Sequence, residues 1–404
     1  MQNHDALKHD ILILGGGPGG LSTALHLHRI ASHLSSRILI LEKEHYPRHK
    51  LCAGGLAVDA EVMLERLGLD VTEVPHVDAA SAHFDFAGTG LALHDSRKHM
   101  LRIIRRDEFD AWLAGKTREA GIEIREGVTV RNVQPDDQGV TVETDQGDFH
   151  AQVVVGADGS NGVTRRCILP NEPVYTARVL EVITPSHPLP APPPSFAKHH
   201  RKGLKTGKDG RGQTAYFDFF PVPDNIAGYV WDFPTQVNRE PMRCWGIYDT
   251  NILADGSRPA LKEPLAREMK RHGFNLDEYE IKGHPIRWYT PWNTVSVPRV
   301  LLVGDAVGAD PVFGEGISIA LGYGAVAAQE ISKSFRRRDF SFRGYKRRLA
   351  WSGLGQSLFA RWAITYIIYP LKWKWFQILM WRISKPLVLL VAWLFVLNWS
   401  KRLR

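Results

Sequence analysis

The first forty residues combine apolar runs with one glycine-rich turn. Residues 11–14 are apolar at every position, which predicts a strand buried on both faces. A helix is predicted over 21–30, and a second strand over 39–42 ends in Glu42. A strand, a turn, a helix and a strand in this order are typical of the β–α–β unit that binds nucleotides in α/β proteins.

The turn itself has the spacing of a dinucleotide-binding fingerprint. Gly15, Gly17 and Gly20 form a G-x-G-x-x-G pattern directly after the first strand. These glycines allow a tight turn and let a diphosphate approach bare backbone N–H groups at the start of the helix. Glu42 stands where an acidic residue binds a ribose hydroxyl. Glycines alone also mark ordinary turns, but the ordered set predicts dinucleotide binding.

Two later apolar strands also lead into an aspartate beside a glycine. The strand over 148–155 runs into Asp158 and Gly159, and the strand over 300–303 runs into Gly304 and Asp305. Both carboxylates are expected at the carboxyl ends of strands, where α/β sheets bind ligands. A plain Asp-Gly turn, and close packing of the small-residue helix predicted over 317–331, are the structural alternatives.

A loop and an aromatic strand supply further candidate chemistry. Cys52 lies in the loop 43–56 among several cations, and a cation beside a thiol lowers its pKa and favours the thiolate. The alternative is a glycine turn with a small buried thiol. In the predicted strand 228–234, Tyr229, Trp231 and Phe233 alternate and therefore share one face. They form an apolar wall, or simply part of the core.

Composition limits the class of protein. The 404 residues are 44% hydrophobic and 23% charged, as in globular proteins of about two domains. The three scattered cysteines have no metal-binding spacing, so no metal site is expected and a reducing compartment is favoured. The net charge is +8, but no nucleic-acid-binding motif accompanies it, so no nucleic-acid partner is expected. The proline-rich and basic stretch over 184–213 is predicted to be a surface excursion.

The last seventy residues differ from the rest. Residues 334–348 are basic, seven of the twelve tryptophans lie in 351–404, and residues 386–397 form an unbroken apolar run. That run is shorter than the roughly 18–20 residues that a spanning helix needs. Tryptophans interleaved with Lys and Arg suit a membrane interface. We therefore expect this region to hold the protein at the cytoplasmic face of a membrane; a helical pair packed on the domain is the alternative.

Taken together, these motifs resemble the geranylgeranyl reductase family, within the flavoproteins typified by p-hydroxybenzoate hydroxylase. The resemblance covers about residues 10–330 and implies FAD as cofactor. It implies a Rossmann-like α/β FAD-binding domain and a second α+β domain with a substrate-binding sheet. A C-terminal helical region is expected after these domains, where the resemblance no longer applies. The residues that it places at the cofactor are Gly15, Gly17, Pro18, Gly20, Glu42, Lys43, Arg106, Val130, Asp158, Gly159, Gly304, Asp305, Gly314, Gly316 and Ile317.

Two further segments narrow the resemblance. Residues 47–55 are similar to the family's Pro-x-x-Lys-x-Cys-Gly-Gly segment, with Ala53 in place of the first glycine. Residues 229–234 are similar to its lipid-lining Tyr-x-Trp-x-Phe-Pro motif. The catalytic residues implied are Cys52, Tyr229 and Trp231. The substrate-binding residues implied are Tyr229, Trp231, Phe233, Pro234 and Phe219.

The resemblance also implies a division of the chain and a reaction. The FAD-binding domain is expected over 1–80, 100–175 and 285–333, the substrate domain over 81–99 and 176–284, and the tail over 334–404. The expected reaction is reduction of C=C bonds in a polyprenyl lipid by reduced FAD. A flavin-dependent monooxygenase or halogenase and a membrane quinone oxidoreductase are the alternatives. NAD(P)H, ferredoxin and quinol all remain open as the electron donor.

Overall fold

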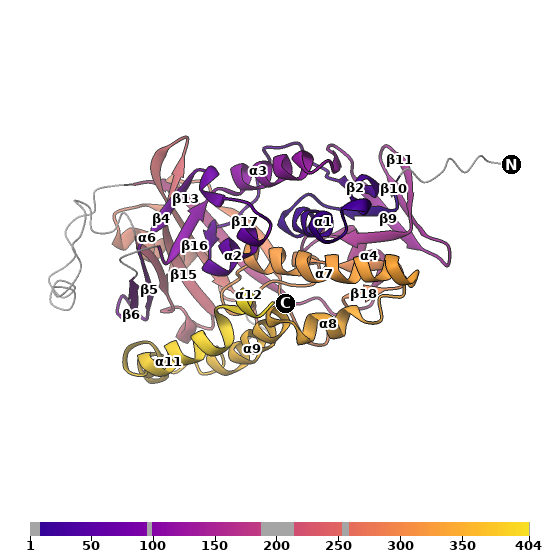
Figure 1. Cartoon of the computed structure of the whole chain (residues 1–404). Coiled ribbons are helices and arrows are strands. Elements are labelled where there is room, and N and C mark those ends of the chain that lie inside the picture. Colours follow the sequence, from indigo (N-terminus) through magenta and orange to yellow (C-terminus); the bar gives the residue numbers. More distant parts are fainter. Residues whose placement is uncertain (1–8, 95–98, 187–213, 253–257, 404) are drawn as a thin grey trace.

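The computed structural model describes residues 9–94, 99–186, 214–252 and 258–403. Two large sheets lie toward opposite ends of the molecule, and the tail helices run along one side (Figure 1). The predicted surface excursion over 184–213 lies outside the described residues except for its first three positions.

The first sheet is the predicted parallel α/β sheet. It has six strands in the order β18-β19-β12-β1-β2-β8, and β1 pairs in parallel with both β2 and β12. Only β18 runs antiparallel to its neighbour. The strands are β1 (Ile11–Leu14), β2 (Ile38–Leu41), β8 (Glu123–Arg125), β12 (Val153–Gly156), β18 (Ser296–Val297) and β19 (Val300–Leu302).

The two faces of this sheet are covered by different layers. Ile11 and Ile13 pack with apolar side chains of the helices on one face, whereas Leu12 and Leu14 pack against a small antiparallel sheet on the other. Burial on both sides explains why β1 is apolar throughout. The helices of this layer are α1 (Pro18–Ile30), α3 (Arg106–Glu119) and α7 (Ile317–Arg337); the small sheet has β9 (Val130–Pro135), β10 (Val140–Thr144) and β11 (Gly147–Ala151).

The second large sheet is mostly antiparallel, with the strand order β17-β13-β16-β15-β14-β5-β6. Its strands come from residues 81–94 and 176–287, close to the predicted substrate domain, whose limits stay a prediction. They are β5 (Ser81–Asp85), β6 (Gly90–His94), β13 (Thr176–Pro185), β14 (Thr214–Asp218), β15 (Gly228–Val237), β16 (Glu240–Asp249) and β17 (Lys282–Arg287).

Shorter elements join the two halves. One three-stranded sheet has the order β3-β7-β4 and connects the loop after β2 to the start of α3. The charged helix α6 covers the outer face of the second sheet with its Leu265 and Met269. The bounds are β3 (Gly55–Leu56), β4 (His76–Ala79), β7 (Leu101–Ile104), α2 (Val58–Arg66), α4 (Val163–Ile168) and α6 (Lys262–Arg271), with 3₁₀ turns η1 (Ser32–Arg37), η2 (Val71–Glu73), η3 (Val222–Asp224), η4 (Leu276–Glu278) and η5 (Gly304–Ala306).

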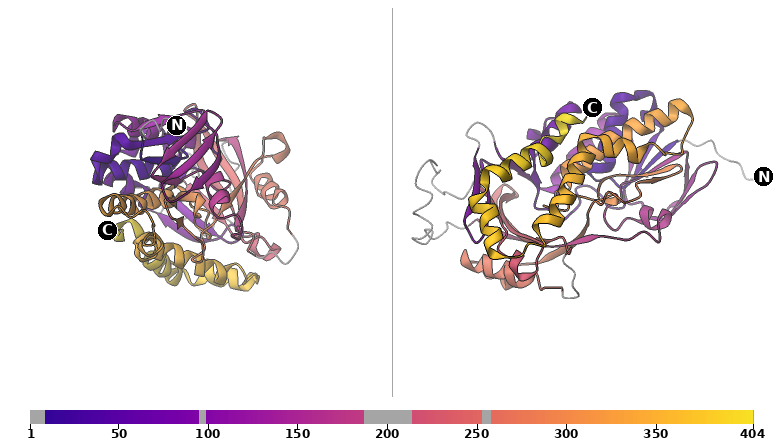
Figure 2. Two further views of the ribbon diagram at one scale, coloured as in Figure 1. Left: turned by 90° about the vertical axis from the view of Figure 1, so that its right-hand side faces the viewer. Right: turned by 90° about the horizontal axis from the view of Figure 1, so that it is seen from below.

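The tail contributes side chains to the hydrophobic core beneath the helices of the first sheet and to the core on the second sheet. Trp399 is fully buried against Gly322 of α7, where an added Cβ would lie 2.5 Å from its ring. Trp381 stacks on Phe219, with ring centroids 4.1 Å apart. The tail therefore packs on the rest of the chain, as the alternative of a packed helical region predicts. It has α8 (Tyr345–Trp351), α9 (Gly353–Ile368), α10 (Lys374–Ile378), η6 (Leu379–Ile383), α11 (Lys385–Val391), η7 (Ala392–Val396) and α12 (Trp399–Arg402) (Figure 2).

Among the described residues, no single helix is both long and apolar enough to cross a membrane. One pair of segments, Lys374–Ile383 and Lys385–Arg402, passes the length and composition test together, with a bend of 79° between them.

Candidate active site

The glycine turn is closed so tightly that side chains are excluded at two positions. Gly15 has φ +110°, and a Cβ there would lie 2.4 Å from the carbonyl oxygen of Ala157. At Gly20 a Cβ would lie 2.1 Å from the carbonyl oxygen of Gly15. At Gly17 a Cβ would have only Arg48 within 4 Å, at 3.6 Å, so this side is open. With Pro18 as its first residue, α1 presents its N-terminus to that open side, as a diphosphate requires.

Glu42 lies beside this turn, in the predicted place. Its Oε2 accepts a hydrogen bond of 2.7 Å from the Gly16 backbone N–H, and the side chain is buried. The sequence analysis missed Tyr46, whose hydroxyl donates to the Gly16 carbonyl oxygen. The loop after β2 therefore folds over the turn. In the sequence, only the presence of a tyrosine in the loop pointed to this bond, because Tyr46 reaches Gly16 only when the loop folds back over the turn.

Asp158 and Gly159 form the turn that leads from β12 to α4. The Asp158 Oδ2 accepts hydrogen bonds from the Thr164 backbone N–H and hydroxyl, at 2.8 and 2.9 Å. Its Oδ1 is buried without a hydrogen-bond partner. Burial raises the pKa of this carboxyl, although the bonds from Thr164 oppose the shift. A structural role in the turn is therefore evident, and a role at the cofactor stays a prediction.

The turn after β19 meets the glycine turn directly. A Cβ on Gly19 would lie 3.4 Å from the Cα of Gly304. Asp305 follows in η5, and a Cβ on Gly316 would lie 3.5 Å from its Oδ1. Ile317 then begins α7. Residues from three distant stretches that were assigned to the cofactor are thus brought to one place.

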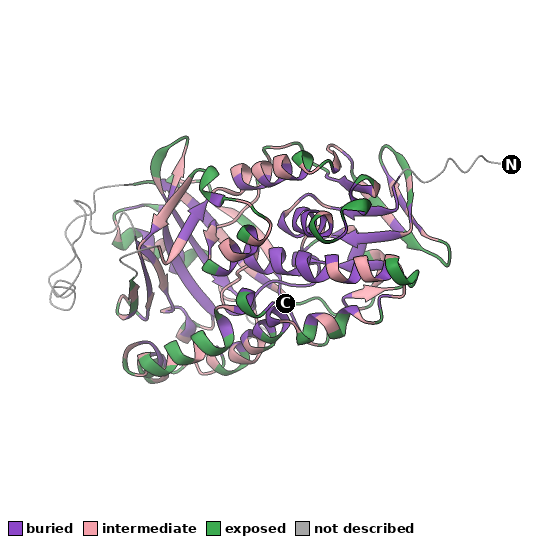
Figure 3. Ribbon diagram, viewed as in Figure 1, coloured by how far each residue is buried: buried purple, intermediate pink, exposed green. Residues whose placement is uncertain are grey.

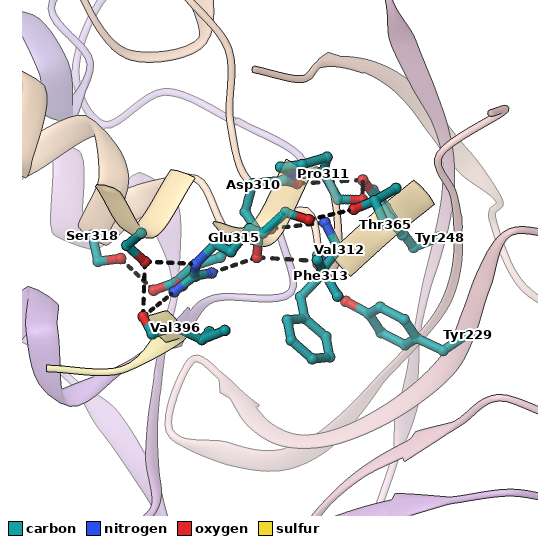
Figure 4. Close-up of polar contacts among 12 residues, drawn as sticks. Tyr229, Tyr248, Asp310, Pro311, Val312, Phe313, Glu315, Ser318, Thr365 and Val396 are labelled. Atoms are coloured by element: carbon teal, nitrogen blue, oxygen red, sulfur yellow. Dashed lines mark hydrogen bonds and ion pairs between the residues drawn. The ribbon is translucent and has the colours of Figure 1, made fainter. Parts of the chain in front are cut away.

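Gly314 lies in the loop 310–316, which is held by tyrosine hydroxyls from the second sheet (Figure 4) and by one from the tail. The hydroxyls of Tyr229, Tyr248 and Tyr369 donate to the carbonyl oxygens of Phe313, Pro311 and Val312, at 2.5, 3.1 and 2.6 Å. Gly314 has φ +67°, and a Cβ there would lie 2.7 Å from the Tyr248 ring. Backbone and side chains together fix this loop.

Arg106, the first residue of α3, forms a bidentate ion pair with Asp110, with two bonds of 2.8 Å. Burial disfavours its charge, but Asp110 outweighs burial, so the pKa of Arg106 is raised. Two other predicted cofactor residues lie apart from this cluster. Lys43 is exposed in the loop after β2, and Val130 packs on β9 within the core beneath the first sheet.

Cys52 lines a pocket of about 280 Å³ together with Arg106 and Cys244. Its Sγ accepts a weak hydrogen bond of 3.4 Å from the Gly54 backbone N–H. Burial raises the pKa of the Cys52 thiol, and the nearby Arg106 offsets only part of that shift. The thiolate expected from the neighbouring cations is therefore wrong: the thiol keeps its proton, because loss of water outweighs the attraction of a single fixed cation.

The aromatic wall is present and buried. Tyr229, Trp231 and Phe233 are each at most 5% exposed and lie in one cluster that the tail covers with Tyr369 and other side chains. The Trp231 Nε1–H donates to the sulfur of Cys244 at 3.5 Å, which ties the wall to the Cys52 pocket.

The other two predicted substrate residues, Pro234 and Phe219, differ in where they lie relative to the aromatic wall. Pro234 lies on β15 next to Phe233 and hence on the opposite face of the sheet. Phe219 follows β14 and shares the cluster of the wall.

These features fit FAD. The bare helix N-terminus suits a diphosphate, and the three converging turns form a backbone cradle in which added side chains would clash. Bound FAD would supply the hydride donor of this site.

Replacing Gly15 by valine is expected to lower FAD affinity at least about tenfold, equivalent to about 1.4 kcal/mol. The added side chain would clash with Ala157 and require φ +110°, which valine rarely adopts. Gly121→Ala is the matched control, because Gly121 also has positive φ (+76°) but nothing lies within 4 Å of its Cβ position. The flavin absorbance per protein checks both variants; full flavin content in Gly15→Val would contradict the assignment.

Comparisons with known proteins show which family and which proteins this chain is similar to. Residues 8–326 match the model of the FAD binding domain family. An uncharacterized protein of Methanosarcina barkeri is 26% identical over 344 residues, covering 84% of this chain and 79% of its own. Digeranylgeranylglycerophospholipid reductase of Thermoplasma acidophilum is 25% identical over 354 residues, covering 82% and 80%.

A solved structure shows the same fold. The crystal structure of a geranylgeranyl bacteriochlorophyll reductase-like protein from Thermoplasma acidophilum has a TM-score of 0.76 with this chain, at 19% identity and 98% coverage of both. The wider set of similar proteins includes a monooxygenase and flavin-dependent halogenases. The resemblance to geranylgeranyl reductases is thereby confirmed, as is FAD as the cofactor. The chain belongs to the FAD binding domain family and is an FAD-dependent oxidoreductase.

Proposed function

We propose that this protein reduces C=C bonds of a polyprenyl lipid with a hydride from reduced FAD. The observation that carries the proposal is that the aromatic wall, through Trp231 and Cys244, lies next to the pocket of the protonated Cys52 thiol. Trp231 of the wall bonds to Cys244, and Cys244 lines the same pocket as Cys52. The aromatic wall and the proton donor therefore lie on either side of Cys244.

The chemistry fits this arrangement. An isolated alkene has no carbonyl to take up charge, so its reduction needs a proton at one carbon and a hydride at the other, in a site without water. Cys52 retains its proton and can give it to the alkene. The ring faces of Tyr229 and Trp231 are suited to stabilise positive charge that develops on carbon. The named activity of the Thermoplasma relative, which reduces a digeranylgeranyl lipid, supports the same substrate class.

The experiment is a single turnover without oxygen. The flavin of the purified holoenzyme is reduced by light, and the protein is mixed with a geranylgeranyl lipid in detergent. The expected result is reoxidation of the flavin with gain of one H₂ per double bond, measured by mass spectrometry. An oxygenated or halogenated product that forms only after oxygen and a halide are admitted would indicate a monooxygenase or halogenase, and reoxidation by a quinone alone would indicate a quinone oxidoreductase.

The tail supports a membrane-bound substrate. Fifteen of the twenty exposed large hydrophobic side chains in the described residues lie after residue 350. Leu387, Trp393 and Phe395, on α11 and η7, are 60%, 61% and 50% exposed. Figure 3 shows α11 largely exposed on the outer side of the tail. Lys385 and Arg402 stand near the two ends of this apolar surface. This arrangement suits attachment to the anionic, cytoplasmic face of a membrane.

Replacing Leu387, Trp393 and Phe395 together by serine is expected to weaken vesicle binding at least about 100-fold, since burying each such side chain contributes roughly 1.5–3 kcal/mol. Flotation with vesicles that contain an anionic lipid measures this. The control is Ile30→Ser with Val58→Ser, which removes side chains of similar exposure (49% and 51%) outside the segment from α11 to η7. Equal flotation of the two variants would place the membrane contact elsewhere.

A further inference from the structure

Glu181 is a buried carboxyl group that the expected reaction does not yet use. It lies on β13, is 7% exposed, and its Oε2 has no hydrogen-bond partner. A buried polar oxygen without a partner is costly and calls for an explanation. The sequence analysis missed this residue, because an acidic side chain within a predicted strand gives no sign of what it faces.

Glu181 and Trp231 lie in one row across the second sheet. In the strand register, Gly246 of β16 pairs with Glu181 on one side and with Trp231 on the other. Side chains of directly paired residues point to the same face of a sheet. A Cβ on Gly246 would lie 2.0 Å from the Trp231 ring, so the indole covers this position. The carboxyl of Glu181 therefore lies on the face of the aromatic wall.

The pocket of about 280 Å³ joins Glu181 to Cys52 and to solvent. Glu181, Cys52 and Cys244 all line it. His49 and Glu280 also line it and are exposed, so they mark its open side. A proton can thus travel from water through this pocket to a buried carboxyl next to the thiol.

The groups around Glu181 balance its charge only in part. Burial raises the pKa of Glu181 to about 7, while Arg105 and Lys282, the Cys52 backbone N–H and the Cys244 thiol oppose the shift. The carboxyl therefore titrates near neutral pH, where it can take up or release a proton. The other titratable groups that line the pocket are His49, Lys50, Arg106, Asp107 and Glu280.

We propose that Glu181 supplies the proton that Cys52 passes to the substrate. The inference rests on the proposed reduction of an alkene. In each turnover the alkene gains a hydride, whose two electrons come from reduced FAD, and a proton, as the S–H bond of Cys52 breaks. The O–H bond of Glu181 then breaks as that S–H bond re-forms, and the carboxylate takes a proton from water in the pocket. The residues themselves are neither oxidised nor reduced.

The kinetic test compares Glu181→Gln, Glu181→Asp and the rim control Glu280→Gln in the holoenzyme. Glu181→Gln is expected to lower kcat for alkene reduction by about 10²–10³-fold and to remove the decline of kcat above pH 7. Glu181→Asp restores an acid and is expected to recover part of the rate and the pH dependence. Bound FAD reports that each variant is folded.

An independent test follows the Cys52 thiol without turnover. The rate of its alkylation by iodoacetamide is measured in the holoenzyme against pH, with the modified peptide identified by mass spectrometry. A negative charge on Glu181 raises the pKa of Cys52. The wild-type rate should therefore rise less steeply above pH 7 than that of Glu181→Gln, while Glu280→Gln follows the wild type.

The outcomes separate the two proposals. If the wild type reduces the lipid but Glu181→Gln keeps its rate and pH profile, or if the alkylation profiles coincide, the role of Glu181 is overturned and the proposed function stands. If the wild type with reduced FAD reduces no polyprenyl lipid, the proposed function fails and the proton-supplying role fails with it. Loss of rate together with the predicted change in alkylation supports both.

Discussion

Replacing Cys52 by alanine is expected to lower the turnover of alkene reduction by about 10²–10⁴-fold, the usual contribution of a proton donor in the transition state. The thiol lines the pocket next to Arg106, and burial keeps it protonated. Cys244 lines the same pocket, but its sulfur accepts a hydrogen bond from the Trp231 indole. The measurement is kcat with a geranylgeranyl lipid and chemically reduced flavin, which separates this step from flavin reduction.

FAD binding should survive this change, because the cradle is made by Gly15, Gly20 and the turns packed on them. Cys167→Ala is the control: this cysteine is also free, but it lies on α4, outside the residues that line the pocket. Loss of rate in Cys52→Ala alone supports proton donation. If Cys52→Ala reduces the lipid at the wild-type rate, its thiol is structural and the loop around it is an ordinary glycine turn.

The sequence was sufficient wherever the chemistry depends on a local pattern. The glycine spacing, the apolar strand before it and Glu42 after it all lie within 33 residues, and the structure places them side by side. The same holds for Tyr229, Trp231 and Phe233, whose alternation in one strand determines that they share a face. Backbone geometry alone relates such residues, so their arrangement can be predicted without the rest of the fold.

The sequence was not sufficient to predict a pKa, because burial and nearby charges shift it in opposite directions and both depend on the fold. Counting the cations near Cys52 predicts a thiolate, but the pKa depends on how much water the folded loop excludes, and burial prevails. Glu181 is similar, because its environment is set by Gly246 and by the loop that carries Cys52, which are distant in sequence. Desolvation can be judged only from the assembled structure.

The tail shows the same limit for composition. Tryptophans mixed with Lys and Arg indicated a membrane interface, yet the seven in 351–404 have opposite environments. Trp381 and Trp399 are 4% and 0% exposed and complete the cores, whereas Trp373 and Trp393 are 58% and 61% exposed. The breaks between the tail helices and the π-helical turns η6 and η7 change which side of the helix faces the core. The spacing of an ideal α-helix therefore does not predict which tail residues are buried.

Arg361 is expected to be the side chain of the tail whose loss costs most stability. It is a charged residue within an apolar stretch of the tail, yet it is only 2% exposed. Its Nη1 donates to Asp310 and, at 2.8 Å, to Glu315, and its Nη2 donates to the Val396 carbonyl oxygen at 3.1 Å. It thereby joins α9 and η7 to the loop 310–316 beside the cofactor turns. The ion pairs with Asp310 and Glu315 each link residues more than forty positions apart.

Replacing Arg361 by methionine is expected to lower the free energy of unfolding by about 3–5 kcal/mol, because two carboxylates are left with no cation in a buried site. Burial already raises the pKa of Asp310, and Arg361 opposes that shift. Without Arg361 the pKa of Asp310 must rise further. Protonation at acid pH then relieves the buried charge, so the loss of stability should shrink as the pH falls.

Urea unfolding at several pH values measures this effect, and two variants sharpen it. Lys262→Met removes an exposed ion pair with Asp277 and should change stability by at most about 1 kcal/mol. Adding Asp310→Asn and Glu315→Gln to Arg361→Met removes the uncompensated charges and should recover part of the loss at neutral pH, since a neutral group costs less to bury than an unpaired charge. A methionine variant as stable as the wild type would mean that packing alone holds the tail to the loop. The expected loss, with recovery in the triple variant, would show that a buried charge couples the tail to the loop 310–316 beside the cofactor turns.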